Sequence, residues 1–165
     1  MDEKIIWSIV FVSLVILLCV VKPNAGRIFL GFFYLIMAIG VNLINAVKNP
    51  ISTVLMGADS FLPFYRTFFS EVVSAAPALF IILVAVFQIT MGLLILSKNN
   101  NVKAGLTGTS FFLVCITPFG VIQIPWLGIA AVQIYLLRKE FDKSFLEIIV
   151  KTEKPNNSIN NFQTP

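Results

Sequence analysis

The sequence predicts an all-α integral membrane protein, with a four-helix transmembrane bundle, an extra N-terminal span and an interfacial amphipathic helix in a long outer loop. Composition is the first observation behind this class. Of the 165 residues, 58% are apolar and 12% are charged, whereas soluble proteins carry about a quarter charged residues. The second observation is charge distribution: the mean hydropathy is +0.91, and long uncharged runs separate the charges, which is typical of a chain surrounded by lipid.

Uncharged segments define the predicted spans. A transmembrane helix needs about 20 mostly apolar residues to cross a hydrocarbon core of about 30 Å. The uncharged run from Ala104 to Leu137 is too long for one helix. Pro118 and Pro125 interrupt it, so we predict two short helices with a break around Pro118, although a single pass is the alternative. The predicted spans are residues 5–21, 28–47, 78–96, 104–117 and 122–137.

Basic residues predict the orientation of these spans. With five passes, Lys4, Lys48 and Arg66 lie on one side and all other lysines and arginines on the other. Because positive loops stay inside, the N-terminus is predicted outside and the C-terminus in the cytoplasm, in a bacterial cytoplasmic membrane. The acidic start of the chain favours a retained first span over a cleaved signal peptide.

The outer loop contains a predicted interfacial helix at about residues 61–75. Ser60 is expected to cap it and Pro63 to lie in its first turn. The apolar side chains that recur at helical spacing are Phe61, Phe64, Tyr65, Phe68, Phe69, Val72 and Val73. Such a helix suits the lipid–water boundary. Two interpretations stay open: an interfacial anchor, or a lid over the mouth of the bundle.

The residues after the last span predict a cytoplasmic surface helix. Phe141, Phe145, Ile148 and Ile149 share one helical face, so we expect the last span to continue as a surface helix at about residues 139–154. Pro155 should end it. Residues 155–165 are polar and are predicted to be a disordered tail after a single transmembrane domain, residues 1–154.

Chemically reactive groups are scarce in the predicted spans. Every Asp, Glu, Lys and Arg falls outside them, and the chain contains no His. Proton-driven transport is therefore disfavoured, and we predict no catalytic residue and no metal site. Cys19 and Cys115 lie in different spans and are expected to be small core residues. Anionic lipid accounts for the net charge of +4, so no nucleic-acid partner is implied.

Neutral polar residues form stripes on two spans. The stripe on the second span is Gly31, Tyr34, Ala38, Asn42 and Asn45, and that on the third is Ala85, Gln88 and Gly92. Such stripes let helices approach closely and let amides hydrogen-bond across the interface. The alternative is a ligand-binding site in which Tyr34, Asn42, Asn45 and Gln88 face a lipophilic molecule such as a quinone. Gln133 lies nearer a helix end and is expected in the headgroup region.

Two segments carry a family resemblance. Residues 26–40 (GRIFLGFFYLIMAIG) and 85–94 (AVFQITMGLL), separated by the long outer loop, resemble the first two helices of the DoxX-like family of small bacterial membrane proteins. The resemblance extends from about Gly26 to Leu137. It implies a four-helix bundle, and some relatives are linked to quinone-dependent oxidation of reduced sulfur compounds. Family members often carry an acidic residue near Gln88 and a lysine near Asn42 or Asn45, where this chain has amides.

Two functional hypotheses follow. The first is a non-enzymatic accessory or scaffold component that works with other membrane-protein subunits in the lipid bilayer. The second is a binder of a lipophilic small molecule such as a quinone, as part of a redox system. The first is favoured by the absence of ionisable groups from the spans, and the second by the polar stripes and the family resemblance.

Overall fold

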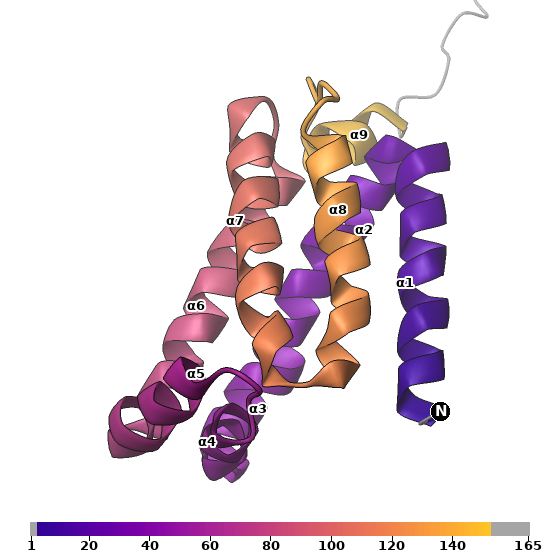
Figure 1. Ribbon diagram of the computed structural model, residues 1–165. Coiled ribbons are helices and arrows are strands. Elements are labelled where there is room, and N and C mark those ends of the chain that lie inside the picture. The colour runs from indigo at the N-terminus through magenta and orange to yellow at the C-terminus, as the bar shows by residue number, and fades with distance from the viewer. Residues whose placement is uncertain (1–2, 153–165) are drawn as a thin grey trace, which may run out of the picture.

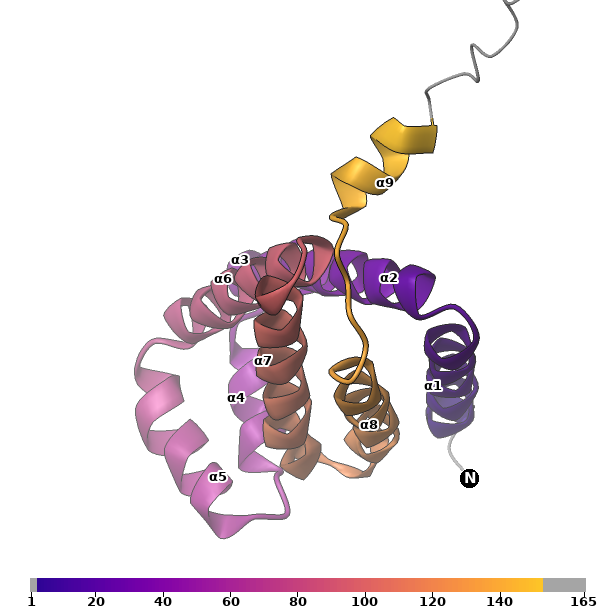
Figure 2. The same cartoon turned by 90° about the horizontal axis from the view of Figure 1, so that it is seen from above.

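The computed structural model describes residues 3–152, and within this range the chain forms helices, turns and loops without strands. Long rods run alternately up and down, and a group of short helices, which we call the cap, lies at one end (Figure 1). The rods are α1 (Glu3–Val21), α2 (Pro23–Ile36) with its extensions η1 (Met37–Leu43) and α3 (Ile44–Lys48), α6 (Pro77–Leu96), α7 (Asn100–Ile116) with η4 (Thr117–Phe119), and η5 (Val121–Trp126) with α8 (Leu127–Leu136). The cap comprises α4 (Ile51–Ala58), α5 (Pro63–Thr67), η2 (Phe68–Val72) and η3 (Val73–Ala75). It lies on the side of α6 and α7, away from α1 (Figures 1 and 2).

Four of the described rods are long and apolar enough to cross a membrane. They are Glu3–Val21, Pro23–Lys48, Pro77–Leu96 and Asn100–Phe119. The fifth rod, Val121–Leu136, is also apolar but shorter. The helices agree with the all-α prediction and with an integral membrane protein at this coarse level. The 3₁₀ turn η4 and Gly120, whose φ of 156° suits only glycine, separate the last two rods.

Two ends of the bundle have different character. We call one the basic end: there α1 meets α2, α6 meets α7, and the chain leaves α8 towards α9 (Phe145–Thr152) (Figure 1). We call the other the cap end, because α4 and α5 lie there, as does the start of α1 (Figure 1).

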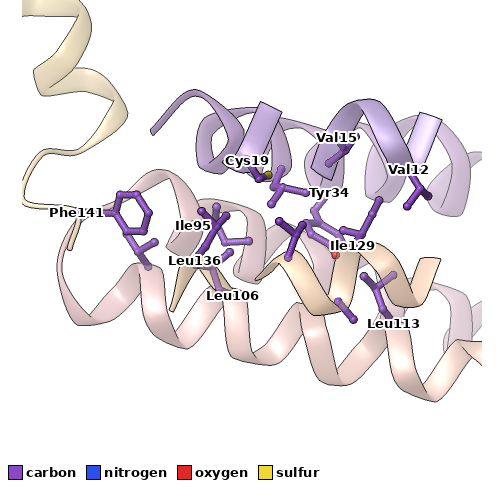
Figure 3. Packing of buried hydrophobic residues seen from close by; sticks show 14 residues of the cluster. Val12, Val15, Cys19, Tyr34, Ile95, Leu106, Leu113, Ile129, Leu136 and Phe141 are labelled. Carbon is purple, nitrogen blue, oxygen red and sulfur yellow. The ribbon is translucent and has the colours of Figure 1, made fainter. Parts of the chain in front are cut away.

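Glycines bring the rods close together towards the basic end. A Cβ atom on Gly31 would lie 2.6 Å from Leu96 Cγ, and one on Gly92 would lie 3.0 Å from Gly31 O, so α2 and α6 pack backbone to backbone. A Cβ atom on Gly105 of α7 would meet Ile95 N of α6 at 2.9 Å. These close approaches are the small-residue packing that the stripes predict. The buried apolar cluster formed by α1, α2, α6, α7 and α8 is shown in Figure 3.

Arg27 corrects the prediction that no charged side chain lies inside the bundle. Glu3, Lys4, Lys48 and Lys103 also fall on the membrane-length helices, but Arg27 is buried there. The second rod begins at Pro23 rather than residue 28, because proline suits the first turn of a helix. Arg27 therefore lies on α2, and its side chain is fully buried. Its Nη1 donates to Ser97 O at 2.6 Å and its Nη2 to Lys143 O at 2.8 Å, while the guanidinium lies 4.8 Å from the centre of the Phe141 ring. These contacts compensate a buried charge.

The surface helix after α8 differs from its prediction. It was expected at residues 139–154 as a continuation of the last span, but α8 ends at Leu136 and α9 starts only at Phe145. Pairing of Lys143 O with Arg27, and of Phe141 O with Asn99 N at 2.8 Å, holds the intervening chain out of a helix. Seen from above, α9 projects away from the bundle (Figure 2). The predicted tail, residues 155–165, lies outside the described residues.

A capping box begins α9. Ser144 N donates to Glu147 Oε2 at 2.8 Å, and Glu147 N donates to Ser144 Oγ at 3.3 Å, so two backbone donors of the first turn are satisfied reciprocally. Glu147 also pairs with Lys98 Nζ at 2.6 Å. Through this pair, α9 is attached to the turn between α6 and α7.

The outer loop also differs in detail. A short helix that the sequence analysis missed, α4, precedes the predicted interfacial helix, which occupies residues 63–75 rather than 61–75. Ser60 does not cap it, since the N-cap position is Leu62. Instead, Ser60 Oγ is buried and donates to Pro118 O at 2.6 Å. The serine therefore joins the cap to the break after α7.

Candidate functional site

A cavity of about 910 Å³ lies at the cap end, between the rods and the cap. Small-molecule sites commonly measure about 300–1,000 Å³ and are mostly apolar with a few polar groups. All four residues of the predicted site, Tyr34, Asn42, Asn45 and Gln88, line this cavity. The structure thus brings the polar residues of the two stripes together at this cavity.

A π-helical segment shapes this wall. η1 interrupts the rod of α2 and α3 with seven π-helical residues, Met37–Leu43. The π-helix is rare and occurs often at functional sites, because its wider turn displaces side chains from α-helical positions. Met37, Val41 and Asn42 of η1 line the cavity, as do Phe68 and Phe69 of the second π-helical segment, η2. Both segments therefore contribute to the same site.

An amide pair joins α6 to η1. Asn42 Nδ2 donates to Gln88 Oε1 at 2.7 Å, and Gln88 is only 4% exposed. This bond is the helix-bridging contact that the structural interpretation predicts. Other polar atoms of the wall stay without a partner. Within residues 3–152, Asn42 Oδ1, Gln88 Nε2 and the side chain of Asn45 make no hydrogen bond. A ligand in the cavity has both donors and acceptors within its walls.

Tyr34 is held by a buried polar network. Gln133 Nε2 donates to the Tyr34 hydroxyl oxygen at 2.8 Å, while Gln133 Oε1 accepts from Ser110 at 2.9 Å and from Thr109 at 3.2 Å. Gln133 is fully buried, so the prediction that it lies in the headgroup region is wrong. The network joins α2, α7 and α8 and fixes the tyrosine ring at the inner boundary of the cavity.

Aromatic rings form much of the remaining lining. On one side, the Phe11, Phe33 and Trp126 rings from α1, α2 and η5 have centroids 5.7–5.9 Å apart. On the cap side, the Phe69 ring lies 5.0 Å from that of Phe119 and 5.4 Å from that of Phe80. Such surfaces suit apolar or aromatic groups of a ligand.

The cap is fastened to the break at Pro118. The last carbonyls of a helix have no partner within it, and the end of α7 presents Cys115 O and Pro118 O. Tyr65 OH donates to Cys115 O at 2.9 Å and Ser60 Oγ to Pro118 O. Burial raises the pKa of Tyr65, so its hydroxyl keeps the donated proton at neutral pH. Phe64, Tyr65, Phe68 and Phe69 of this segment line the cavity, while other side chains of residues 63–75 are exposed, so both the anchor and the lid interpretation stay open.

The lining offers hydrogen bonds, ring faces and apolar contact. Within residues 3–152, no group of three or more His, Cys, Asp and Glu side chains is placed to hold a metal ion. Cys115 lies on the cavity wall, whereas Cys19 is buried in the cluster near the basic end. Gln133, Ser8 and the phenylalanine and tryptophan residues of the wall were not among the predicted site residues. The buried Ser8 Oγ has no hydrogen-bond partner in the described part of the chain.

No protein family, curated protein or solved structure that was compared matches this chain.

Proposed function

We propose that this chain is a membrane-embedded binding protein for a lipophilic small molecule, and that the cap-end cavity is its binding site. The observation that supports this most is the combination of a cavity of about 910 Å³ with an amide pair on its wall. This favours the second of the two functional hypotheses over an accessory or scaffold role, because a scaffold needs no cavity. The proposed role is binding rather than catalysis.

A quinone fits the chemistry of this site. Its carbonyl oxygens accept hydrogen bonds, which Gln88 Nε2 and the Asn45 amide can donate. Its ring can stack against the aromatic lining, and its isoprenoid chain suits the apolar remainder. The resemblance to the DoxX-like family supports the same ligand class.

The proposed setting is a bacterial cytoplasmic membrane crossed five times. Four rods are long enough to cross a membrane, and the alternating direction of the rods, the shorter Val121–Leu136 included, supports a fifth pass (Figure 1). The fifth rod is short, and a locally thin bilayer would accommodate it. Lys22, Arg27, Lys98 and Arg138 gather at the basic end, which supports a cytoplasmic C-terminus. In this proposed orientation the cavity belongs to the outer half of the membrane.

Extraction of the purified protein tests the proposed function. The full chain is purified in mild detergent, extracted with organic solvent, and the extract is analysed by mass spectrometry. We expect one lipophilic compound at about one molecule per chain. In the double variant Asn42→Leu, Gln88→Leu, recovery should fall about tenfold, since loss of one or two hydrogen bonds costs about 1.4 kcal/mol or more.

Thr90→Val provides the matched control. Thr90 lies on α6 close to Gln88, is exposed, and its hydroxyl bonds only to Val86 O of its own helix. This variant removes a polar group from the same helix without touching the cavity, so recovery should be unchanged. A wild-type extract without a stoichiometric lipophilic compound, together with a protein partner that co-purifies, would instead support the accessory hypothesis.

A further inference from the structure

A groove of about 310 Å³ lies beside the cavity, between α6 and α7. Its lining is apolar apart from one thiol. Three of its residues, Leu83, Phe87 and Phe111, line the groove but not the cavity.

The groove and the cavity share a wall. Phe80 and Val84 of α6, and Phe112 and Cys115 of α7, line both spaces. Residues three or four apart lie on the same face of a helix, so each helix contributes one adjacent pair. These four side chains, none of them charged, therefore lie between the cavity and the groove, and the Phe112 ring packs 5.8 Å from that of Phe87.

The groove opens on surfaces that suit hydrocarbon. Leu83 is 59% exposed and Phe111 is 69% exposed, and they lie on two of the helices long enough to cross a membrane. In a bilayer, such side chains contact lipid chains. The rim of the cavity near α1, α4 and η5 is different, because Lys4, Ser52, Thr53 and Gln123 make it polar.

From this arrangement we infer that the ligand is a two-part lipid, which enters sideways from the bilayer between α6 and α7. Its hydrogen-bonding head lies against Asn42 and Gln88, and its hydrocarbon chain passes the shared wall and occupies the α6–α7 groove. This inference rests on the proposed function, and it adds the shape of the ligand and its route. A water-soluble ligand would need the polar rim and would leave the groove to bulk lipid.

Photolabelling tests the position of the chain. The full-length protein in nanodiscs is exposed to two probes with the same ten-carbon chain ending in a diazirine, one with a benzoquinone head and one with a phosphatidylcholine head. We expect saturable labelling by at least one probe at Leu83, Phe87 or Phe111, which an excess of the same lipid without the diazirine removes. The head that gives saturable labelling identifies the class of lipid.

Other labelling patterns separate the two proposals. Saturable labelling at Ser52, Thr53 or Gln123 instead would overturn the lateral route and leave the binding function standing. Labelling that excess unlabelled lipid does not reduce, with either probe, is ordinary bilayer contact and would overturn both.

A matched pair of substitutions tests the groove independently. Leu83→Trp fills the groove, whereas Val86→Trp enlarges a side chain on the same helix outside it, and the two residues are 59% and 54% exposed. For Leu83→Trp we expect the probe concentration at half-saturation to rise about tenfold, because the chain loses apolar burial equivalent to about two methylenes. Val86→Trp should leave it unchanged. Equal values for the two variants would contradict the groove as the site of the chain.

Discussion

The basic end and the cap end are opposite ends of the same long helices, yet one is closely packed and the other contains a cavity. At the basic end, glycines at the facing positions of α2, α6 and α7 bring backbones into contact, and Arg27 joins three segments. At the cap end, π-helical turns, prolines and large rings hold the rods apart. The difference shows that local side-chain size, rather than overall hydropathy, decides where an apolar bundle is solid and where it can hold a ligand.

The largest expected effect follows from removing the Arg27 contacts. Arg27→Met keeps an apolar stem but leaves the part-buried carbonyls of Ser97 and Lys143 without their charged donor. We expect a loss of about 3 kcal/mol in stability, and faster hydrogen exchange in residues 137–152. Thermal unfolding in detergent and exchange mass spectrometry measure these effects. Arg138→Met, at an exposed arginine, is the control, and an equal loss in that variant would contradict a specific role for Arg27.

Alanine substitutions at two glycines of the second rod compare how tightly the two ends are packed. Gly31→Ala places a Cβ atom 2.6 Å from Leu96 Cγ, whereas in Gly40→Ala the nearest atom is Ile36 Cγ2 at 3.9 Å. We expect Gly31→Ala to lose about 2 kcal/mol of stability through overpacking. Gly40→Ala should be neutral or slightly stabilising, since alanine is the better helix former. Unfolding temperatures check the pair, and a larger loss for Gly40→Ala would contradict the contrast.

Substitutions at two glutamines compare the buried hydrogen-bond network with the wall of the cavity. Gln133→Leu leaves Ser110 and the Tyr34 hydroxyl without a shared partner in the bundle, so we expect a loss of about 1 kcal/mol. Gln88→Leu breaks one bond beside the cavity and should cost less stability but more of the bound lipophilic compound. Unfolding temperature and recovered compound are measured for both variants. The opposite ranking on both measures would contradict the division of roles.

The smallest effect concerns pH at the basic end. The hydrogen bond from Lys98, followed by that from the Ser144 backbone, lowers the pKa of Glu147 below its ordinary value of 4.5. Because the folded pKa lies below the unfolded one, the carboxylate stabilises the docked α9 above pH 4.5, and this contribution is lost as pH falls through the lowered pKa. Protection of α9 from hydrogen exchange, measured relative to the intrinsic exchange rate at each pH, should therefore fall in acid. Glu147→Gln should abolish the pH dependence without changing exchange at the cap end.

The sequence predicts the rods well, because long uncharged runs and proline breaks are local signals that dominate the behaviour of a chain in lipid. It also predicts that Asn42 and Gln88 lie on stripes of small and polar residues whose amides can hydrogen-bond across helices, and the two amides do form such a bond. It misplaces Arg27 and Gln133, whose burial depends on distant partners: Lys143 for the arginine, and Tyr34 and Ser110 for the glutamine. One signal in the sequence does indicate that Gln133 is buried. Ala130, Gln133 and Leu136 are spaced three apart, so they share one helix face, and all three are buried.

The cavity itself could not be predicted from local patterns. It depends on the π-helical segment at Met37–Leu43, which has no sequence signature in this chain, and on the cap. The cap in turn depends on hydrogen bonds from Ser60 and Tyr65 to carbonyls at the end of the fourth rod. These carbonyls lie 58 positions away from Ser60 and 50 positions away from Tyr65 in the sequence. A periodic pattern shows which face of a helix is apolar. It does not show whether another segment packs against that face or leaves a cavity beside it.

A density map of the protein in a lipid nanodisc tests the central claim most directly. We predict elongated non-protein density inside the cap-end cavity, with one end against Asn42 and Gln88. A cap collapsed onto those amides, or a cavity that contains only water, would contradict the account.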